Sequence, residues 1–307
     1  MLDVSFIQST NTTSQTFYAQ SGSNSWQTWV KPRNAKMVRI LCVGAGGGGG
    51  GGGNYGVPPG GIAAGGNGGA SGGITNGLFP AFLLPDTLYV QPGFGGQGGL
   101  GSVGSSTVNG SGTGGVAGQI SVVSVSPTGS TKSAITYAVG GRGGGGGTFG
   151  SNAISQGADS TAAVTTTFQR LGIVDASATE PSLDGLVSTP VTKSAFDTTY
   201  NISIMQGAIG GARYPSATLY SGSSIMGKSI LTGSMIKGGL NGGSGNPGIG
   251  STSPFFYGTG ASGGAAAGGI GGNGFYGCGA GGGAGGYSTG GNGGKGGDGL
   301  VIITTLY

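Results

Sequence analysis

Alternating apolar and polar positions open the chain and predict short β-strands. Up to residue 43, these runs are rich in Phe, Tyr, Trp and Val and are separated by Ser, Asn, Gly and Pro, which favours strands joined by turns. We expect strands in "LDVSFI", "QTFYAQ", "SWQTWV" and "KMVRILCV". The last apolar run, "LVIITTLY", predicts one more strand.

From Gly44 onward, apolar runs lead directly into glycine. The strand-like run "MVRILCV" is followed by Gly44, Ala45 and eight glycines, and "TLYVQ" and "AITYAV" continue into glycine in the same way. Several strand-then-glycine units indicate a loose internal repeat. In "GGNGGKGGDGLVIITTLY" the order is reversed, because glycine leads into the strand. We therefore predict that both ends of the glycine-rich sequence are anchored in one β layer.

Composition divides the sequence into four segments. Residues 1–43 form an N-terminal β region, 44–150 a glycine-rich region, 151–205 a Gly-poor insertion, and 206–307 a second glycine-rich region that ends in a strand. The insertion holds five of the eight acidic residues. A division of this kind predicts a separate role for residues 151–205.

Glycine supplies 80 of the 307 residues, far above its usual share of about 7%. Collagen is excluded, because only 12 prolines are present and the glycines come in pairs. A flexible linker would not alternate with strands. The polyglycine form of the left-handed three-fold helix remains, and its backbone groups need partners on neighbouring tracts. We expect a mostly β protein with a packed bundle of left-handed polyglycine II helices and irregular loops.

The period of the glycines predicts how such tracts pack. In "GGNGGKGGDG" every third residue is not glycine, so Asn292, Lys295 and Asp298 would share one edge of a three-fold helix. The run Gly46 to Gly53 has no side-chain edge. We expect it to lie centrally, surrounded by other tracts.

The residue types needed for common catalytic chemistry are missing or isolated. The chain has no histidine, which removes His-based triads and most zinc sites. Cys42 and Cys278 lie in apolar or Gly-rich settings and are expected to be free buried thiols. The stretch "GSSIMGKS" matches a phosphate-loop pattern, but the short segment after it is broken by Gly233, which favours a loop. We expect no enzyme, no catalytic residues, no metal and no cofactor.

The net charge of +4 is spread thinly along the chain. Lys31, Arg33, Lys36 and Arg39 form the one basic cluster and alternate with apolar residues, which is typical of solvated strand and turn positions. We therefore expect no nucleic-acid binding. No apolar window approaches the length of a membrane span and no signal peptide is apparent, so we expect no membrane insertion.

Many aromatic residues follow glycine tracts at points where the chain must turn. They could cap the ends of the tracts and cover exposed backbone, or they could form a binding surface of rigid loop-borne side chains. The stretch "PFFYG" is the best single candidate for the second role, because its three adjacent aromatics cannot all face one core. The candidate receptor-binding residues are Tyr55, Tyr214, Tyr220, Phe255, Phe256, Tyr257, Tyr276 and Tyr287.

Two stretches resemble the start and end of glycine-rich domains in bacteriophage tail and virion proteins. They are "WVKPRNAKMVRILCVGAGGGGGGGG" and "GAGGGAGGYSTGGNGGKGGDGLVIITTLY". That family shows an aromatic-x-x-Pro strand entry, a strand ending in Gly-Ala-Gly-Gly-Gly, and a final Gly-Gly-x-Gly-x-Gly run that leads into an apolar strand. The chain is also similar to the receptor-binding tip adhesins of some phage long tail fibres, and it differs from them in having residues 151–205.

The resemblance implies a virion protein, a tail-fibre or tail-tip component that attaches to a host surface protein or glycan. Its other partners would be virion proteins, and a homo-oligomer is compatible with it. Two alternatives stay open: a purely structural virion protein of the tail, neck or capsid appendage, and a non-viral glycine-rich extracellular module. Loop aromatics and low charge are compatible with either a sugar or a protein target.

Overall fold

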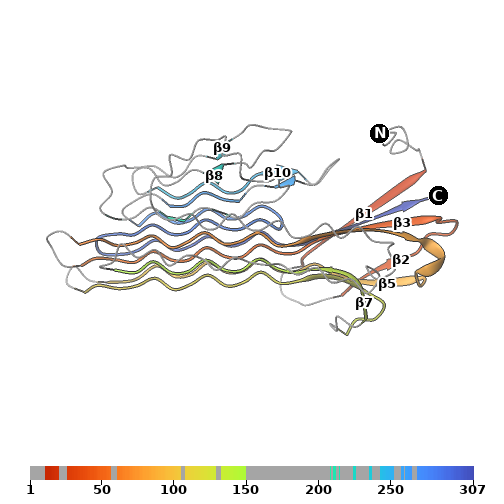
Figure 1. Cartoon of the computed structure of the whole chain (residues 1–307), viewed down its shortest axis with the longest axis horizontal. Coiled ribbons are helices and arrows are strands. Elements are labelled where there is room, and N and C mark those ends of the chain that lie inside the picture. Colours follow the sequence, from red (N-terminus) through yellow and green to blue (C-terminus); the bar gives the residue numbers. More distant parts are fainter. Residues whose placement is uncertain are drawn as a thin grey trace.

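The computed structural model describes a mostly β molecule with two distinct parts. Figure 1 shows β-strands gathered at one end and glycine-rich segments running side by side toward the other. Almost no helix is present among the described residues. The structure describes residues 11–20, 26–56, 61–104, 108–128, 133–149, 208, 210–211, 214, 224–225, 235–236, 243–251, 257–258, 260–264 and 268–307.

The first sheet has four antiparallel strands in the order β1-β12-β3-β4. β3 lies beside β12 with Val43 opposite Leu300, so strands from the two ends of the glycine-rich sequence are direct neighbours. The prediction that both ends are anchored in one β layer is confirmed. The strands are β1 (Thr12–Tyr18), β3 (Met37–Val43), β4 (Ile74–Pro80) and β12 (Leu300–Leu306).

The second sheet has the order β2-β5-β6-β7 and is also antiparallel. A short 3-10 helix, η2 (Ala81–Leu83), lies between β4 and β5 and so connects the two sheets. The strands are β2 (Gln27–Val30), β5 (Thr87–Gln91), β6 (Ser121–Ser124) and β7 (Ala134–Ala138). Two-residue pairs are β8 (Ser224–Ile225) with β9 (Met235–Ile236), and β10 (Gly250–Ser251) with β11 (Tyr257–Gly258).

The two four-stranded sheets form a sandwich around one apolar core, which we call the sandwich. Alternation along each strand places every second side chain between the sheets. In β3, for example, Val38, Ile40 and Cys42 are fully buried. Leu88 and Ile303 reach the same core from β5 and β12. Burial of one such aliphatic side chain stabilises the fold by roughly 1.5–3 kcal/mol.

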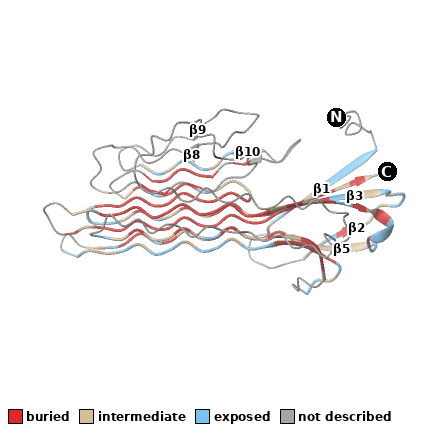
Figure 2. Cartoon of the chain, viewed as in Figure 1, coloured by how far each residue is buried: buried red, intermediate tan, exposed pale blue. Residues whose placement is uncertain are grey.

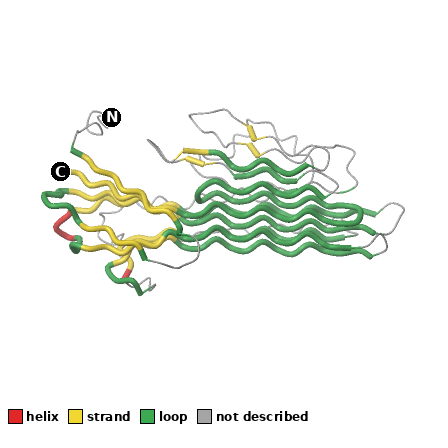
Figure 3. Tube along the Cα trace, turned by 180° about the vertical axis from the view of Figure 1, so that it is seen from behind, coloured by secondary structure: helices red, strands yellow, loops and turns green. Residues whose placement is uncertain are grey.

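Six strands are continuous in sequence with glycine-rich tracts, and all six junctions lie at the same end of the sandwich (Figure 3). β3, β5 and β7 lead out into glycine, whereas β4, β6 and β12 are entered from it. We call the tracts together the glycine region, and its end opposite the sandwich the tip. The tracts are residues 44–54, 61–73, 92–104, 108–120, 139–149, 243–249, 260–264, 268–274, 277–287 and 290–299.

Within tract 44–54 the backbone hydrogen bonds change direction with a period of three residues. Gly46, Gly49 and Gly52 donate to one neighbouring tract, at 2.8–3.0 Å, and the N–H groups between them donate to two others. Every residue from Gly44 to Asn54 is buried, as Figure 2 shows for the middle of the region. Tract 44–54 donates to tracts 290–299, 61–73 and 108–120, and accepts from tracts 92–104, 139–149 and 277–287.

Close approach of backbones explains why tract 44–54 consists of glycine. A Cβ built on Gly50 would lie 2.0 Å from the carbonyl oxygen of Gly145, and one on Gly47 would lie 1.9 Å from that of Arg142. These contacts are with backbone, which cannot turn aside as a flexible side chain would. The residue type is therefore fixed by the distance between tracts.

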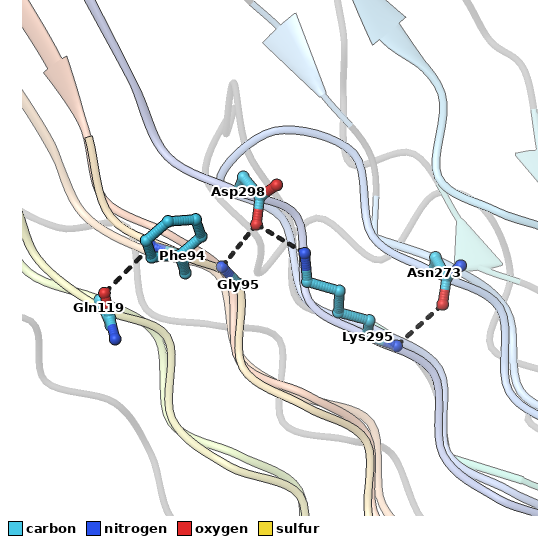
Figure 4. Close-up of polar contacts among 6 residues, drawn as sticks. All are labelled: Phe94, Gly95, Gln119, Asn273, Lys295 and Asp298. Atoms are coloured by element: carbon cyan, nitrogen blue, oxygen red, sulfur yellow. Dashed lines mark hydrogen bonds and ion pairs between the residues drawn. The ribbon is translucent and has the colours of Figure 1, made fainter. Parts of the chain in front are cut away.

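Side chains at every third position supply acceptors to N–H groups along the flank of the glycine region. Asp298 Oδ1 accepts from the N–H of Gly95 at 2.8 Å and from Lys295 Nζ at 2.9 Å (Figure 4). Asn292 Oδ1 accepts from the N–H of Gly101 at 2.8 Å. Asn292 and Asp298 therefore both accept hydrogen bonds from tract 92–104, and Lys295 pairs with Asp298 beside them.

Side-chain oxygens also accept hydrogen bonds from backbone N–H groups on other flanks of the glycine region. Gln119 Oε1 accepts from the N–H of Phe94 at 3.4 Å, and Asn273 Oδ1 accepts from the N–H of Lys295 at 2.9 Å (Figure 4). A buried N–H without a partner costs about 1–3 kcal/mol, so these acceptors matter at the boundary of the region. The predicted insertion 151–205 lies outside the described residues.

Candidate functional site

At the tip, the end of tract 44–54 is held by Asn54. Its side chain is fully buried, and its Nδ2 donates to the carbonyl of Val108 at 2.9 Å. Its backbone exchanges two hydrogen bonds with Gly110. Within the described residues, Asn54 Oδ1 has no hydrogen-bond partner. Asn54 thus ties the end of tract 44–54 to the start of tract 108–120.

Tyr55 is the first aromatic residue of the tip and is partly buried. A Cβ built on Gly61 would lie 1.7 Å from the Tyr55 Cζ, so the ring packs flat against the backbone of that glycine. The Tyr55 N–H donates to the carbonyl of Gly286 at 3.1 Å. The ring therefore covers glycine backbone, and part of it stays accessible.

Tyr214 and Tyr287 lie close together at the tip. Their ring centroids are 6.3 Å apart, with the ring planes inclined at 56°. Tyr214 exchanges backbone hydrogen bonds of 2.7 and 2.8 Å with Ala63, which fixes its position on the end of tract 61–73. Tilted aromatic pairs of this spacing stabilise one another by roughly 0.5–1.5 kcal/mol. The pair places two aromatic rings side by side at the tip.

Further apolar side chains lie at this end. Phe149 is 46% exposed and also forms a bridge with Ala63, and Val103, 92% exposed, forms one with Thr289. The charged side chains that the structure describes belong to the sandwich or to the parts of the tracts near it. We call the following set the tip surface: Tyr55, Val103, Val108, Phe149, Tyr214 and Tyr287.

Tyr276 lies away from the other candidates, where the glycine region meets the sandwich. Its ring packs on Phe275, with centroids 5.2 Å apart, and on Tyr18, at 5.6 Å. The pKa of Tyr276 is raised by burial first, and then by Tyr18 and the Asp298 carboxylate. The pair Phe275 and Tyr276 covers apolar side chains on the outer face of the first sheet. Tyr276 therefore has a packing role there.

Of the remaining candidates, the structure describes only Tyr257. The backbone of Tyr257 belongs to β11 and pairs with Ser251. Tyr220, Phe255 and Phe256 lie outside the described residues, as does most of the phosphate-loop match. For these residues the proposed binding role stays a prediction.

Sequence reasoning missed Asn54, Val103 and Val108. Asn54 could have been noticed as the first polar residue after the pure glycine run. The two valines carry no local signal, because a valine beside a glycine tract is equally compatible with a buried position. Their exposure follows only from the way the tracts turn.

The chemistry of the tip surface is that of a contact surface. Across the described ranges, no group of three or more His, Cys, Asp or Glu side chains is close enough to hold a metal ion. In the same ranges, no helix has the length and apolar character that a membrane crossing requires. Tyrosine combines an apolar ring with a hydroxyl that can donate or accept, which suits both protein and sugar targets.

Comparison with known proteins gives no further assignment. The sequence matches no family model. It also matches no curated protein.

Proposed function

We propose that the tracts are left-handed polyglycine II helices packed as a bundle. The three-residue period of the hydrogen bonds supports this, because a helix with three residues per turn directs every third N–H to the same side. Such a helix rises about 3.1 Å per residue, so tract 44–54 would hold the tip roughly 30 Å from the sandwich. A backbone lattice of this kind acts as a stiff spacer.

We further propose that the chain is a bacteriophage virion protein, a tail-fibre or tail-tip component that attaches to the host cell surface through the tip surface. One observation carries this: aromatic side chains gather, partly exposed, at the end of the glycine region opposite the sandwich. Rigid aromatics lose little conformational entropy on binding, and they dominate many recognition surfaces. The lattice would hold these loops in place while tolerating changes in their sequence.

The test is a binding assay with labelled, folded protein on bacteria that the phage infects. We expect saturable binding that competes with infection. Tyr287→Ser should weaken this binding about tenfold or more, because exposed aromatic anchors carry much of the affinity of such surfaces. Tyr18→Ser is the matched control, since Tyr18 is 43% exposed but lies in the sandwich.

Absence of saturable binding by a verified folded sample would contradict attachment. It would favour the alternative, a purely structural virion protein whose tip contacts other virion proteins. Equal loss of binding in both tyrosine variants would also contradict a role specific to the tip surface.

A further inference from the structure

The sandwich exposes an apolar turn at the end remote from the tip. This turn is η2, the short coiled ribbon of Figure 2. The side chain of Phe82 is 83% exposed, and those of Leu83 and Leu78 are each 44% exposed. Phe82 is followed directly by the exposed Leu83, and the exposed Leu78 precedes it by four residues, so apolar side chains are exposed on the turn and on the strand that leads into it. Exposed apolar side chains of this kind mark a patch suited to contact with another molecule.

The turn that carries Phe82 is fixed from below by Lys31. Lys31 Nζ donates to the carbonyls of Leu84 at 2.7 Å and of Ala81 at 3.3 Å, and it forms an ion pair with Asp86 Oδ1 at 3.0 Å. The side chain of Lys31 is only 20% exposed. Because the turn is already ordered, little conformational entropy would be lost when Phe82 binds a partner.

Basic side chains border this patch. Arg39 lies directly opposite Leu78 in the β3–β4 register, and the N–H of Ala81 donates to the carbonyl of Lys36 at 2.9 Å. Arg33, in the turn before Lys36, is also exposed. Among the described residues, none of these three cations forms an ion pair; Arg39 Nε instead donates to Asn76 Oδ1 at 2.9 Å.

We propose that this patch is a docking surface for a partner protein that offers an apolar pocket to Phe82 and carboxylates to the surrounding cations. The surface consists of Leu78, Phe82, Leu83, Arg33, Lys36 and Arg39. An apolar centre with a charged rim is the ordinary anatomy of a protein interface. Nucleic-acid binding would instead place the cations where they follow a phosphate backbone. Resting on the proposed function, we assign the partner as the virion protein that carries this chain.

The test is a complementation experiment: a phage that cannot express its own copy of the chain is grown in cells that express one variant. The amount of the chain in purified particles is then measured by quantitative immunoblotting. Phe82→Ser and the double variant Lys36→Glu, Arg39→Glu should each be incorporated about tenfold less, or worse. Both should keep the melting temperature of the parent chain within about 2 °C, because the side chains are exposed. Matched controls are Leu100→Ser and Arg142→Glu, which alter exposed residues of the glycine region and should be incorporated normally.

Three results would overturn the inference. Normal incorporation of the docking-surface variants would remove it while leaving the proposed function intact. Tight binding of the purified chain to a short DNA duplex, abolished by Lys36→Glu, Arg39→Glu, would show that nucleic acid is the partner. Absence of the unsubstituted chain from particles would contradict the proposed function itself, and with it this partner.

Discussion

The sandwich and the glycine region solve the same packing problem with opposite parts of the chain. In β3, Val38, Ile40 and Cys42 place side chains in the core, and the backbone pairs at the edges of each strand. Immediately after β3, tract 44–54 has almost no side chains, and its backbone binds neighbours in every direction. One part is held by side-chain volume and the other by backbone distance.

This difference determines which substitutions each part tolerates. A side-chain core accepts another apolar residue of similar size, because neighbouring rotamers can adjust. Neighbouring backbones cannot adjust, and a single added methyl group must displace a carbonyl that is itself hydrogen-bonded. We therefore expect the glycine region to be the part of the molecule more sensitive to small increases in volume.

The largest expected effect comes from Gly50→Ala. The new Cβ would lie 2.0 Å from the carbonyl oxygen of Gly145, and separating the tracts would break several hydrogen bonds. We expect a loss of about 4 kcal/mol or more in the free energy of unfolding, or no soluble protein. Urea unfolding measures this.

Gly114→Ala is the matched control. A Cβ on Gly114 would approach no heavy atom nearer than 3.4 Å, the carbonyl oxygen of Gly144. Its free energy of unfolding should be unchanged or about 0.4–1 kcal/mol higher, because alanine restricts the unfolded chain. Equal destabilisation by Gly50→Ala and Gly114→Ala would contradict the account, because the short distance between tracts at Gly50 would then not explain the loss of stability.

Leu88→Ala measures the contribution of a core side chain in the sandwich to the same quantity, the free energy of unfolding. Leu88 is fully buried between the sheets, so its truncation leaves a cavity and should cost about 2–5 kcal/mol in urea unfolding. Leu100→Ala changes a side chain that is 66% exposed on the glycine region and should cost less than about 0.5 kcal/mol. A larger loss from Leu100→Ala would show that packing of apolar side chains also holds the tracts together.

Substitutions of Asp298 separate the contribution of its hydrogen bond to Gly95 from that of its ion pair with Lys295. Asp298→Ala leaves the buried N–H of Gly95 without its acceptor and should cost about 1–3 kcal/mol in urea unfolding. Asp298→Asn keeps an acceptor oxygen and loses only the ion pair with Lys295, whose side chain is 40% exposed, so its cost should stay below about 1 kcal/mol. If the two variants were equally destabilised, the ion pair would be the important contact.

The last effect is absent at neutral pH and is a pH dependence in the sandwich core. Burial raises the pKa of the Cys42 thiol from 9.0 to about 12, and the nearby Thr136 side chain acts in the opposite direction. The unfolded thiol ionises first, so the stabilisation is fully present below pH 9 and is lost as the pH rises toward 12. The loss should be about 1.4 kcal/mol per pH unit between those values.

Cys42→Ala should reduce this slope between pH 9 and pH 11, when urea unfolding of the variant is compared with that of the parent chain. All other titratable groups are the same in both proteins, so their contribution to the slope cancels. Identical slopes would mean that Cys42 is not buried as described.

The sequence predicted the strands whose apolar runs lead into or out of glycine, namely β3, β5, β7 and β12. It missed β4 and β6, because "ITNGLFP" contains Gly and Pro and "SVVS" is too short to show alternation. Both strands form because the tracts before them lead back to the sandwich, where β4 pairs with β3 and β6 pairs with β5. Whether these residues form a strand depends on the tertiary path of the chain, and no local sequence pattern shows that path.

The tip was predicted only in part for a related reason. Glycine tracts end both at the tip and at the sandwich, and an aromatic residue follows in either case. Tyr55 ends a tract that leaves β3, so its position at the tip could have been worked out by following the chain. Tyr276 stands between two tracts that have no adjacent strand, so nothing local shows that it belongs beside Tyr18.

The most direct test is residue-resolved amide hydrogen exchange on glycine-labelled protein. In tract 44–54 every amide from Gly46 to Gly53 should be protected as strongly as those of β3, because each donates to a neighbouring tract. In tract 92–104, Gly96 and Gly99 should be protected, while Gly98, which donates to no described carbonyl, should exchange quickly. Rapid exchange throughout residues 46–53 would contradict a glycine region held together by its backbone.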